Sequence, residues 1–84
     1  MWRIQLSRQA EGELNALEHA VAKRIGRKIE EAAKDPHRFF MKLVGEEEYK
    51  LRVGDYRVIA LLIHEEQKLI IMRIRHRKNV YKKQ

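Results

Sequence analysis

The chain has 84 residues, the length of one small domain, and contains no cysteine that could form a disulfide or a thiolate metal site. It has no charge-free run close to the roughly 18–20 residues of a membrane span, and residues 1–9 lack the apolar core of a secretory signal, so we expect one cytoplasmic domain over residues 1–84. The formal net charge is +7, which favours a polyanionic partner.

The first half of the sequence has the pattern of one strand and two helices. Residues 2–6 alternate between apolar and polar, as in a half-buried strand, and Ser7 can cap the helix that follows. Apolar side chains then recur at helical spacing through residues 9–34. Because this is long for one helix in a small domain, we expect a break near residues 18–20 that gives a helical hairpin. The Asp-Pro pair at residues 35–36 should end the second helix.

The second half of the sequence changes to the period of two that strands show. After a connector over residues 38–48, three strands are predicted, with Gly54 and Asp55 as a two-residue turn between the first two: residues 49–53, 56–64, and 69–75 or beyond. The predicted fold class is α+β, in the order β-α-α-β-β-β. We expect a mainly antiparallel four-stranded sheet with the N-terminal helical hairpin packed on one face.

The turn fixes which residues of the first two of these strands face each other. With a two-residue turn, Val53 faces Tyr56 and Arg52 faces Arg57, and the alternation puts Lys50 on the same face as the arginines. Two arginines directly opposite each other repel, which costs stability. That cost is offset if a phosphate binds between them, so we interpret the hairpin as an anion clamp.

The basic excess lies at the end of the chain. Residues 1–66 carry twelve basic and twelve acidic side chains, which cancel, whereas residues 67–84 carry seven basic side chains and no acidic one. A basic block of this kind is typical of proteins that bind nucleic acid. The alternative is a solvated face that keeps the chain soluble.

The register of the last strand decides which side chains join the basic patch. If His64 pairs with Leu69, then His76 lies opposite Arg57. Three arginines then fall on the other face, unless a bulge or the end of the strand re-aims them: Arg73, Arg75 and Arg77. The sequence leaves open whether His76 or Arg77 is the next member of the patch.

A patch of this kind could bind or cleave RNA. Arginines form bidentate hydrogen bonds to phosphate, which holds the backbone without reading its sequence. Cleavage by the RNA 2′-hydroxyl also needs a proton acceptor and a proton donor, and His76 and Tyr81 are the nearby candidates. The ordinary roles of such residues are a solvated histidine and a tyrosine packed on the sheet. The remaining histidines are too scattered to predict a metal site, so an enzyme here should be a metal-free nuclease.

Residues 49–83 resemble the second half of toxins of the RelE/ParE superfamily. The stretch "LRVGDYR" is similar to the leucine-arginine-x-glycine-aspartate-tyrosine-arginine hairpin of these toxins, and "HRKNVY" is similar to their basic ending with a tyrosine. The upstream strand, two charged helices and Asp-Pro stop are similar as well. The resemblance therefore covers nearly the whole chain and implies the same α+β fold.

The resemblance to the RelE branch implies a metal-independent, ribosome-dependent endoribonuclease without a cofactor, which cuts messenger RNA in the A site through the RNA 2′-hydroxyl and inhibits translation. By motif position it assigns catalysis to Arg57, Arg77 and Tyr81. The residues expected to bind RNA phosphate are Lys50, Arg52, Arg75, His76 and Lys78. The implied partners are the ribosome, with contacts to 16S ribosomal RNA, and an acidic RelB-like antitoxin, in a complex that can form higher oligomers.

Two other functions stay open at this point. Toxins of the ParE branch share the scaffold but inhibit DNA gyrase and cleave nothing. A non-catalytic RNA-binding or ribosome-binding module could use the same basic face. The joint presence of Arg57, Arg77 and Tyr81 favours the nuclease. No carboxylate is predicted in the patch, so no general base is assigned.

Overall fold

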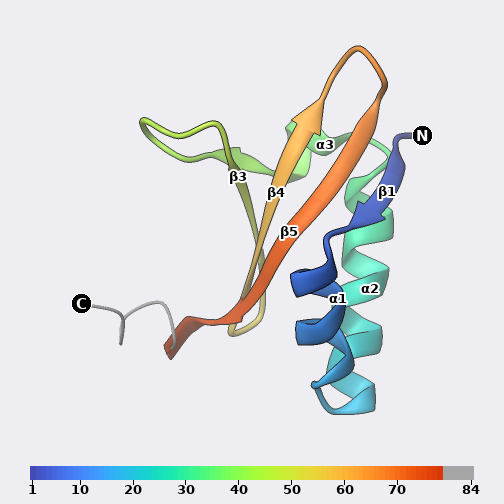
Figure 1. Ribbon diagram of the computed structural model, residues 1–84, viewed down its shortest axis with the longest axis vertical. Coiled ribbons are helices and arrows are strands. Elements are labelled where there is room, and N and C mark those ends of the chain that lie inside the picture. The colour runs from blue at the N-terminus through green and yellow to red at the C-terminus, as the bar shows by residue number, and fades with distance from the viewer. Residues whose placement is uncertain (79–84) are drawn as a thin grey trace.

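The computed structural model describes residues 1–78, which form an α+β fold (Figure 1). Its elements follow one another along the chain as β1 (Arg3–Leu6), α1 (Arg8–Asn15), α2 (His19–Ala32), α3 (Pro36–Phe39), β2 (Met41–Lys42), β3 (Tyr49–Val53), β4 (Tyr56–Ile63) and β5 (Lys68–His76). No described helix is long and apolar enough to cross a membrane.

The strands form a single sheet in the order β1-β5-β4-β3-β2. The first strand pairs in parallel with β5, and the other three pairings are antiparallel. The predicted α+β class and the mainly antiparallel sheet are confirmed, but the predicted number of four strands is wrong. The fifth strand, β2, has only two residues and both are exposed, so the connector shows no alternation from which to predict it.

The predicted helical hairpin is confirmed. The first helix ends at Asn15 and the second begins at His19, so the break falls close to the predicted position. Ser7 caps α1, because its Oγ accepts a hydrogen bond from the backbone amide of Ala10 at 3.0 Å. The second helix ends at Ala32, and Pro36 then starts the unpredicted helix α3, where a proline fits because the first turn needs no amide donor.

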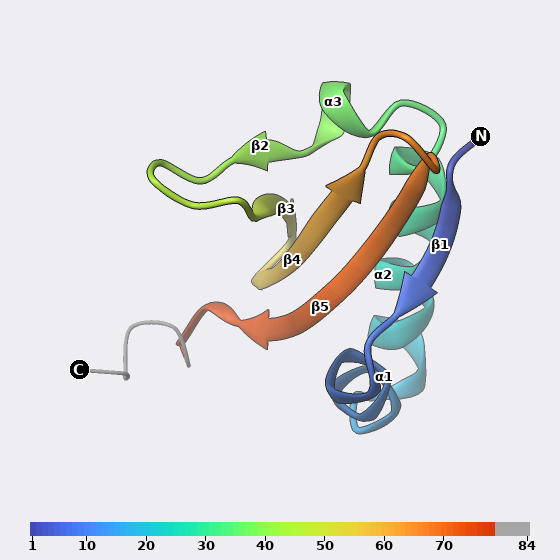
Figure 2. The ribbon, with the colours of Figure 1, turned by 45° about the horizontal axis from the view of Figure 1, so that its top comes forward.

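Helices α1 and α2 lie side by side on one side of the sheet, and no described helix crosses β3 and β4 on the other side (Figures 1 and 2). Ile25 and Ile29 of α2 are buried in the core, which also takes the alternate side chains of the three long strands. We call the sheet surface opposite α1 and α2 the open face. Because it stays accessible, side chains on it are available to a ligand.

A bulge in β5 sets which side chains reach the open face. Near the β4–β5 turn, Ala60 pairs with Ile71, but the next pair is Ile59 with Arg73, so Met72 is an extra residue. Beyond the bulge, each β5 residue lies on the opposite face from the one that an unbroken register would give it. The predicted register, in which His76 faces Arg57, is therefore wrong.

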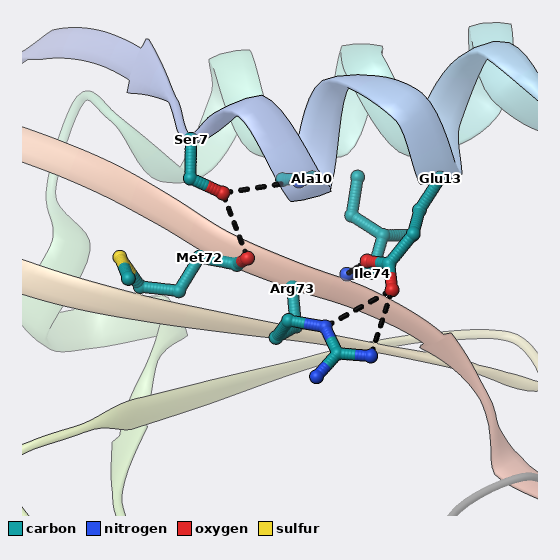
Figure 3. Close-up of polar contacts among 6 residues, drawn as sticks. All are labelled: Ser7, Ala10, Glu13, Met72, Arg73 and Ile74. Carbon is teal, nitrogen blue, oxygen red and sulfur yellow. Dashed lines mark hydrogen bonds and ion pairs between the residues drawn. The ribbon is translucent and has the colours of Figure 1, made fainter.

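Helix α1 covers the part of β5 that β1 leaves unpaired, since β1 reaches only to Ile71. The Oγ of Ser7 donates to the carbonyl oxygen of Met72 at 2.8 Å. The Glu13 carboxylate accepts the amide of Ile74 at 2.6 Å and forms an ion pair with Arg73 at 2.9 Å (Figure 3). These contacts satisfy backbone groups of an exposed strand edge and hold the end of β5 in place.

Candidate functional site

Three arginines form a row across the open face. Arg52 of β3 pairs with Arg57 of β4, as the turn predicts, and Arg57 pairs on its other side with Arg75 of β5. Directly paired residues of a sheet lie within reach of each other, so the row concentrates three positive charges. Arg75 belongs to it only because the bulge turns this part of β5 over.

Arg77 approaches the row from the chain that follows β5. Its backbone amide donates a hydrogen bond of 2.7 Å to the carbonyl oxygen of Asp55, which ties this segment to the β3–β4 turn. One small pocket, which we call the arginine pocket, is lined by Arg52, Asp55, Tyr56, Arg57 and Arg77. The structure thus places Arg77, rather than His76, beside the predicted arginine pair.

His76 lies away from the open face, at the end of β5. It pairs with Tyr56, and the two rings meet edge to face with centroids 5.0 Å apart. Its Nδ1 accepts the backbone amide of Lys78 at 3.1 Å. His76 also lines a groove beside the end of α1 together with Glu13 and Leu17. This placement is another consequence of the bulge, and it separates His76 from the row.

The other predicted site residues have different positions. Lys50 is half-buried and pairs with Ile59, two residues before Arg52 on the same face. Lys78 is exposed just after β5. Tyr81 lies outside the described residues. The structure therefore brings Arg52, Arg57, Arg75 and Arg77 together, with Lys50 next to them.

The charges of the site have no carboxylate partner within the described chain. The ion pairs found over residues 1–78 engage other cations, namely Lys28, Lys68 and Arg73. Asp55 is a carboxylate that lines the arginine pocket, yet it forms none of these ion pairs. Sequence reasoning missed Asp55 because the Gly-Asp pair was interpreted only as a turn. Its position two residues before Arg57 was the available signal.

Two histidines that seemed scattered in the sequence meet in the structure. The Nε2 atoms of His37 and His64 are 2.6 Å apart, and the ring of Trp2 meets both histidines edge to face. This pair lies near Ile63, at the end of β4 away from the arginine pocket. Within residues 1–78, no group of three or more histidine, cysteine or acidic side chains could hold a metal ion.

Residues 4–81 match a protein family described as the ParE toxin of the type II toxin–antitoxin system, parDE. The chain belongs to this family and is thus a toxin of a type II toxin–antitoxin system. No curated protein matches its sequence.

Solved structures of RelE toxins have the same fold. The isolated E. coli RelE toxin is 21% identical, with a TM-score of 0.80 over 98% of this chain and 93% of that chain. The toxin–antitoxin complex RelBE2 of Mycobacterium tuberculosis gives 20% identity and a TM-score of 0.84, over 90% of this chain and 98% of that chain. The archaeal RelE–RelB complex of Pyrococcus horikoshii is 23% identical, with a TM-score of 0.73 over 90% of this chain and 94% of that chain. The predicted RelE-like fold is confirmed.

Proposed function

We propose that this toxin is a metal-independent, ribosome-dependent endoribonuclease that cleaves messenger RNA in the A site and so inhibits translation. The observation that carries the proposal is the arginine pocket. Arg52, Arg57 and Arg77 come from three separate segments and line one small space beside the β3–β4 turn. Like charges gathered in this way destabilise a fold unless an anion is bound, and a phosphodiester is an anion that arginine binds well.

The proposed reaction uses the RNA itself as the nucleophile. The 2′-oxygen attacks the adjacent phosphorus, the bond from phosphorus to the 5′-oxygen breaks, and the products are a 2′,3′-cyclic phosphate and a 5′-hydroxyl. Arg57 and Arg77 are assigned to the negative charge that builds on the phosphate oxygens in the transition state, where positioned cations have their largest effect. Arg52, Arg75 and Lys50 are assigned to holding the backbone, with Lys78 at the edge of the site, whereas His76 lies away from the open face and is assigned no contact with the RNA.

Two proton transfers accompany this reaction. The 2′-hydroxyl must lose a proton and the leaving 5′-oxygen must gain one. Asp55 is a carboxylate that lines the arginine pocket, which makes it our candidate for the acceptor. The resemblance to RelE toxins assigns a catalytic role to Tyr81, and we take it as the donor.

The proposed partners are the ribosome, through 16S ribosomal RNA, and an acidic RelB-like antitoxin. The antitoxin is supported by the solved complexes of RelE toxins with their antitoxins from M. tuberculosis and P. horikoshii. A cytoplasmic location follows for a protein that acts on translating ribosomes.

Primer extension on translated messenger RNA tests the proposal. Wild-type protein should give cuts at fixed positions within codons, and Arg77→Ala and Tyr81→Phe should lose them. Arg8→Ala, which removes an exposed arginine from α1, is the matched control and should cut like wild type. Absence of cuts with the folded wild-type protein on translating ribosomes would disprove the nuclease.

The second candidate function is inhibition of DNA gyrase without nuclease activity, and the match to the ParE toxin family favours it. A supercoiling assay separates the two functions. If the wild-type protein blocks supercoiling by gyrase and leaves messenger RNA intact, the chain acts as a ParE-type inhibitor.

A further inference from the structure

A second group of basic side chains lies on helix α2. Arg24, Arg27 and Lys28 follow one another at spacings of three and one, which places them along one stripe of the helix. The buried residues Ile25 and Ile29 turn another stripe of the same helix towards the core.

The stripe forms one wall of a groove beside the β3–β4 hairpin. The groove has a volume of about 510 Å³ and is lined by Arg24, Arg27, Lys28, Glu31, Arg52, Val53 and Gly54. Its single acidic side chain, Glu31, lies 3.4 Å from the Nζ of Lys28, so that these two charges offset each other. Arg24, Arg27 and Arg52 have no ion-pair partner among residues 1–78.

Arg24 lies close to the turn at Gly54, which has no side chain. A Cβ placed on Gly54 would lie 2.7 Å from Nη2 of Arg24, closer than real Cβ atoms approach other atoms. Gly54 also has a φ of +60°, which favours glycine for a second reason. The guanidinium group of Arg24 therefore packs against the backbone of the turn that carries the arginine pocket.

Arg52 joins the two features, because it lines both the groove and the arginine pocket. A polyanion bound in the pocket can therefore continue past the edge of the hairpin to α2 without leaving positively charged surface. Phosphates repeat regularly along a nucleic acid strand, so a strand is suited to span two adjacent cationic sites.

We infer that the groove is a second phosphate-binding site, where Arg24 and Arg27 hold the RNA backbone next to the segment bound in the arginine pocket. The choice of RNA rests on the proposed function. An acidic protein segment fits less well, because tight protein contacts need apolar or aromatic anchors. The one apolar residue of the groove, Val53, is buried in the core.

The test is binding of a short fluorescent single-stranded RNA with 2′-O-methyl groups, which cannot be cleaved through a 2′-hydroxyl. Fluorescence anisotropy over a series of KCl concentrations compares wild type with the double variant Arg24→Ala/Arg27→Ala. The double variant Arg3→Ala/Arg8→Ala is the control, since it removes two exposed arginines from β1 and α1, at the far edge of the sheet. Circular dichroism confirms that each variant is folded.

The α2 variant should bind at low salt about tenfold more weakly, the loss expected from one or two charge-assisted contacts. The slope of log Kd against log salt should fall by about 1.4, because each phosphate contact to a single strand accounts for about 0.7. The control should match wild type.

Wild-type affinity and an unchanged slope in the folded α2 variant would overturn the inference. The inference would also be overturned if the α2 variant bound RNA as wild type does but no longer bound a synthetic acidic peptide. Because the probe reports binding alone, loss of RNA binding in the α2 variant supports the groove even if messenger RNA is never cut, and then only the proposed nuclease fails.

Discussion

The Glu13 carboxylate accepts the backbone amide of Ile74 at 2.6 Å and pairs with the guanidinium group of Arg73, joining the first helix to the last strand. This one side chain supplies a hydrogen-bond partner to a backbone amide at the edge of β5, where a neighbouring strand would otherwise pair. The site depends on it indirectly, because Arg75 follows directly after this anchored segment of β5.

Replacement of Glu13 should separate the hydrogen bond from the ion pair. Glu13→Ala leaves the amide of Ile74 without its partner and should lower the free energy of unfolding by about 1–2 kcal/mol. Glu13→Gln keeps an acceptor oxygen and loses only the partly exposed ion pair, so its cost should stay below about 1 kcal/mol. Urea unfolding monitored by circular dichroism measures both values. If the two variants lose the same free energy of unfolding, the hydrogen bond to Ile74 does not contribute more than the ion pair.

Removal of one charge from the arginine row should stabilise the fold while weakening function. Arg57→Gln relieves repulsion with both Arg52 and Arg75 and should raise the free energy of unfolding by about 0.2–1 kcal/mol at low salt. The gain should shrink at molar salt, where the screening length is only about 3 Å. Urea unfolding at two salt concentrations tests this, with Arg8→Gln as the matched control. A destabilised variant at low salt would show that the row does not repel.

Asp55→Asn tests the candidate proton acceptor. Asparagine is well tolerated in tight turns and has nearly the same shape, so the fold should persist. The rate of messenger RNA cleavage should fall by about 10²–10⁴-fold, as expected for loss of a general base. Binding of the 2′-O-methyl RNA should stay the same or become tighter, because a negative charge leaves the pocket. An unchanged cleavage rate would exclude Asp55 from proton transfer.

A double-mutant cycle tests the contact between Arg24 and Gly54. Gly54→Ala should lower the free energy of unfolding by about 1 kcal/mol, mainly because of the positive φ, with a smaller part from the Arg24 guanidinium group at the end of its flexible side chain. In an Arg24→Ala background only the backbone part of this cost should remain. If Gly54→Ala costs the same in both backgrounds, Arg24 moves aside freely and is not held at the turn.

The contact between His37 and His64 should also show coupling. Their Nε2 atoms are 2.6 Å apart, so one ring donates and the other accepts. Single alanine variants and the double variant should give a coupling free energy of about 0.5–1.5 kcal/mol, the usual contribution of one hydrogen bond. Unfolding by urea at neutral pH provides the four values. Strict additivity would mean that the rings contribute independently.

Much of the fold is predictable because it follows from local patterns. The helical hairpin is indicated by spacing, and the pairing of Arg52 with Arg57 is fixed by a two-residue turn that few alternatives satisfy. Near the β4–β5 turn the predicted register is off by two positions, since Ile63 pairs with Lys68. An even shift leaves every side chain on its predicted face.

The candidate site was less predictable because it depends on a shift of one residue in the β4–β5 register, which turns side chains to the other face. Met72 is the last residue of the apolar run 69–72, and nothing in this run indicates that one of its residues is extra. The position of Arg77 depends on a hydrogen bond to Asp55, which is formed between segments far apart in the sequence. Interactions of this kind leave no periodic pattern.

The bulge at Met72 has a consequence for how such sites change. On this scaffold, deletion of Met72 would leave Arg75 beside Arg57, whereas straightening the bulge with Met72 kept in the ladder would bring Ile74 there instead. A guanidinium group that binds phosphate would then give way to an apolar side chain that cannot. The local geometry at Met72, with no substitution at any arginine, therefore determines whether the row has three guanidinium groups or two.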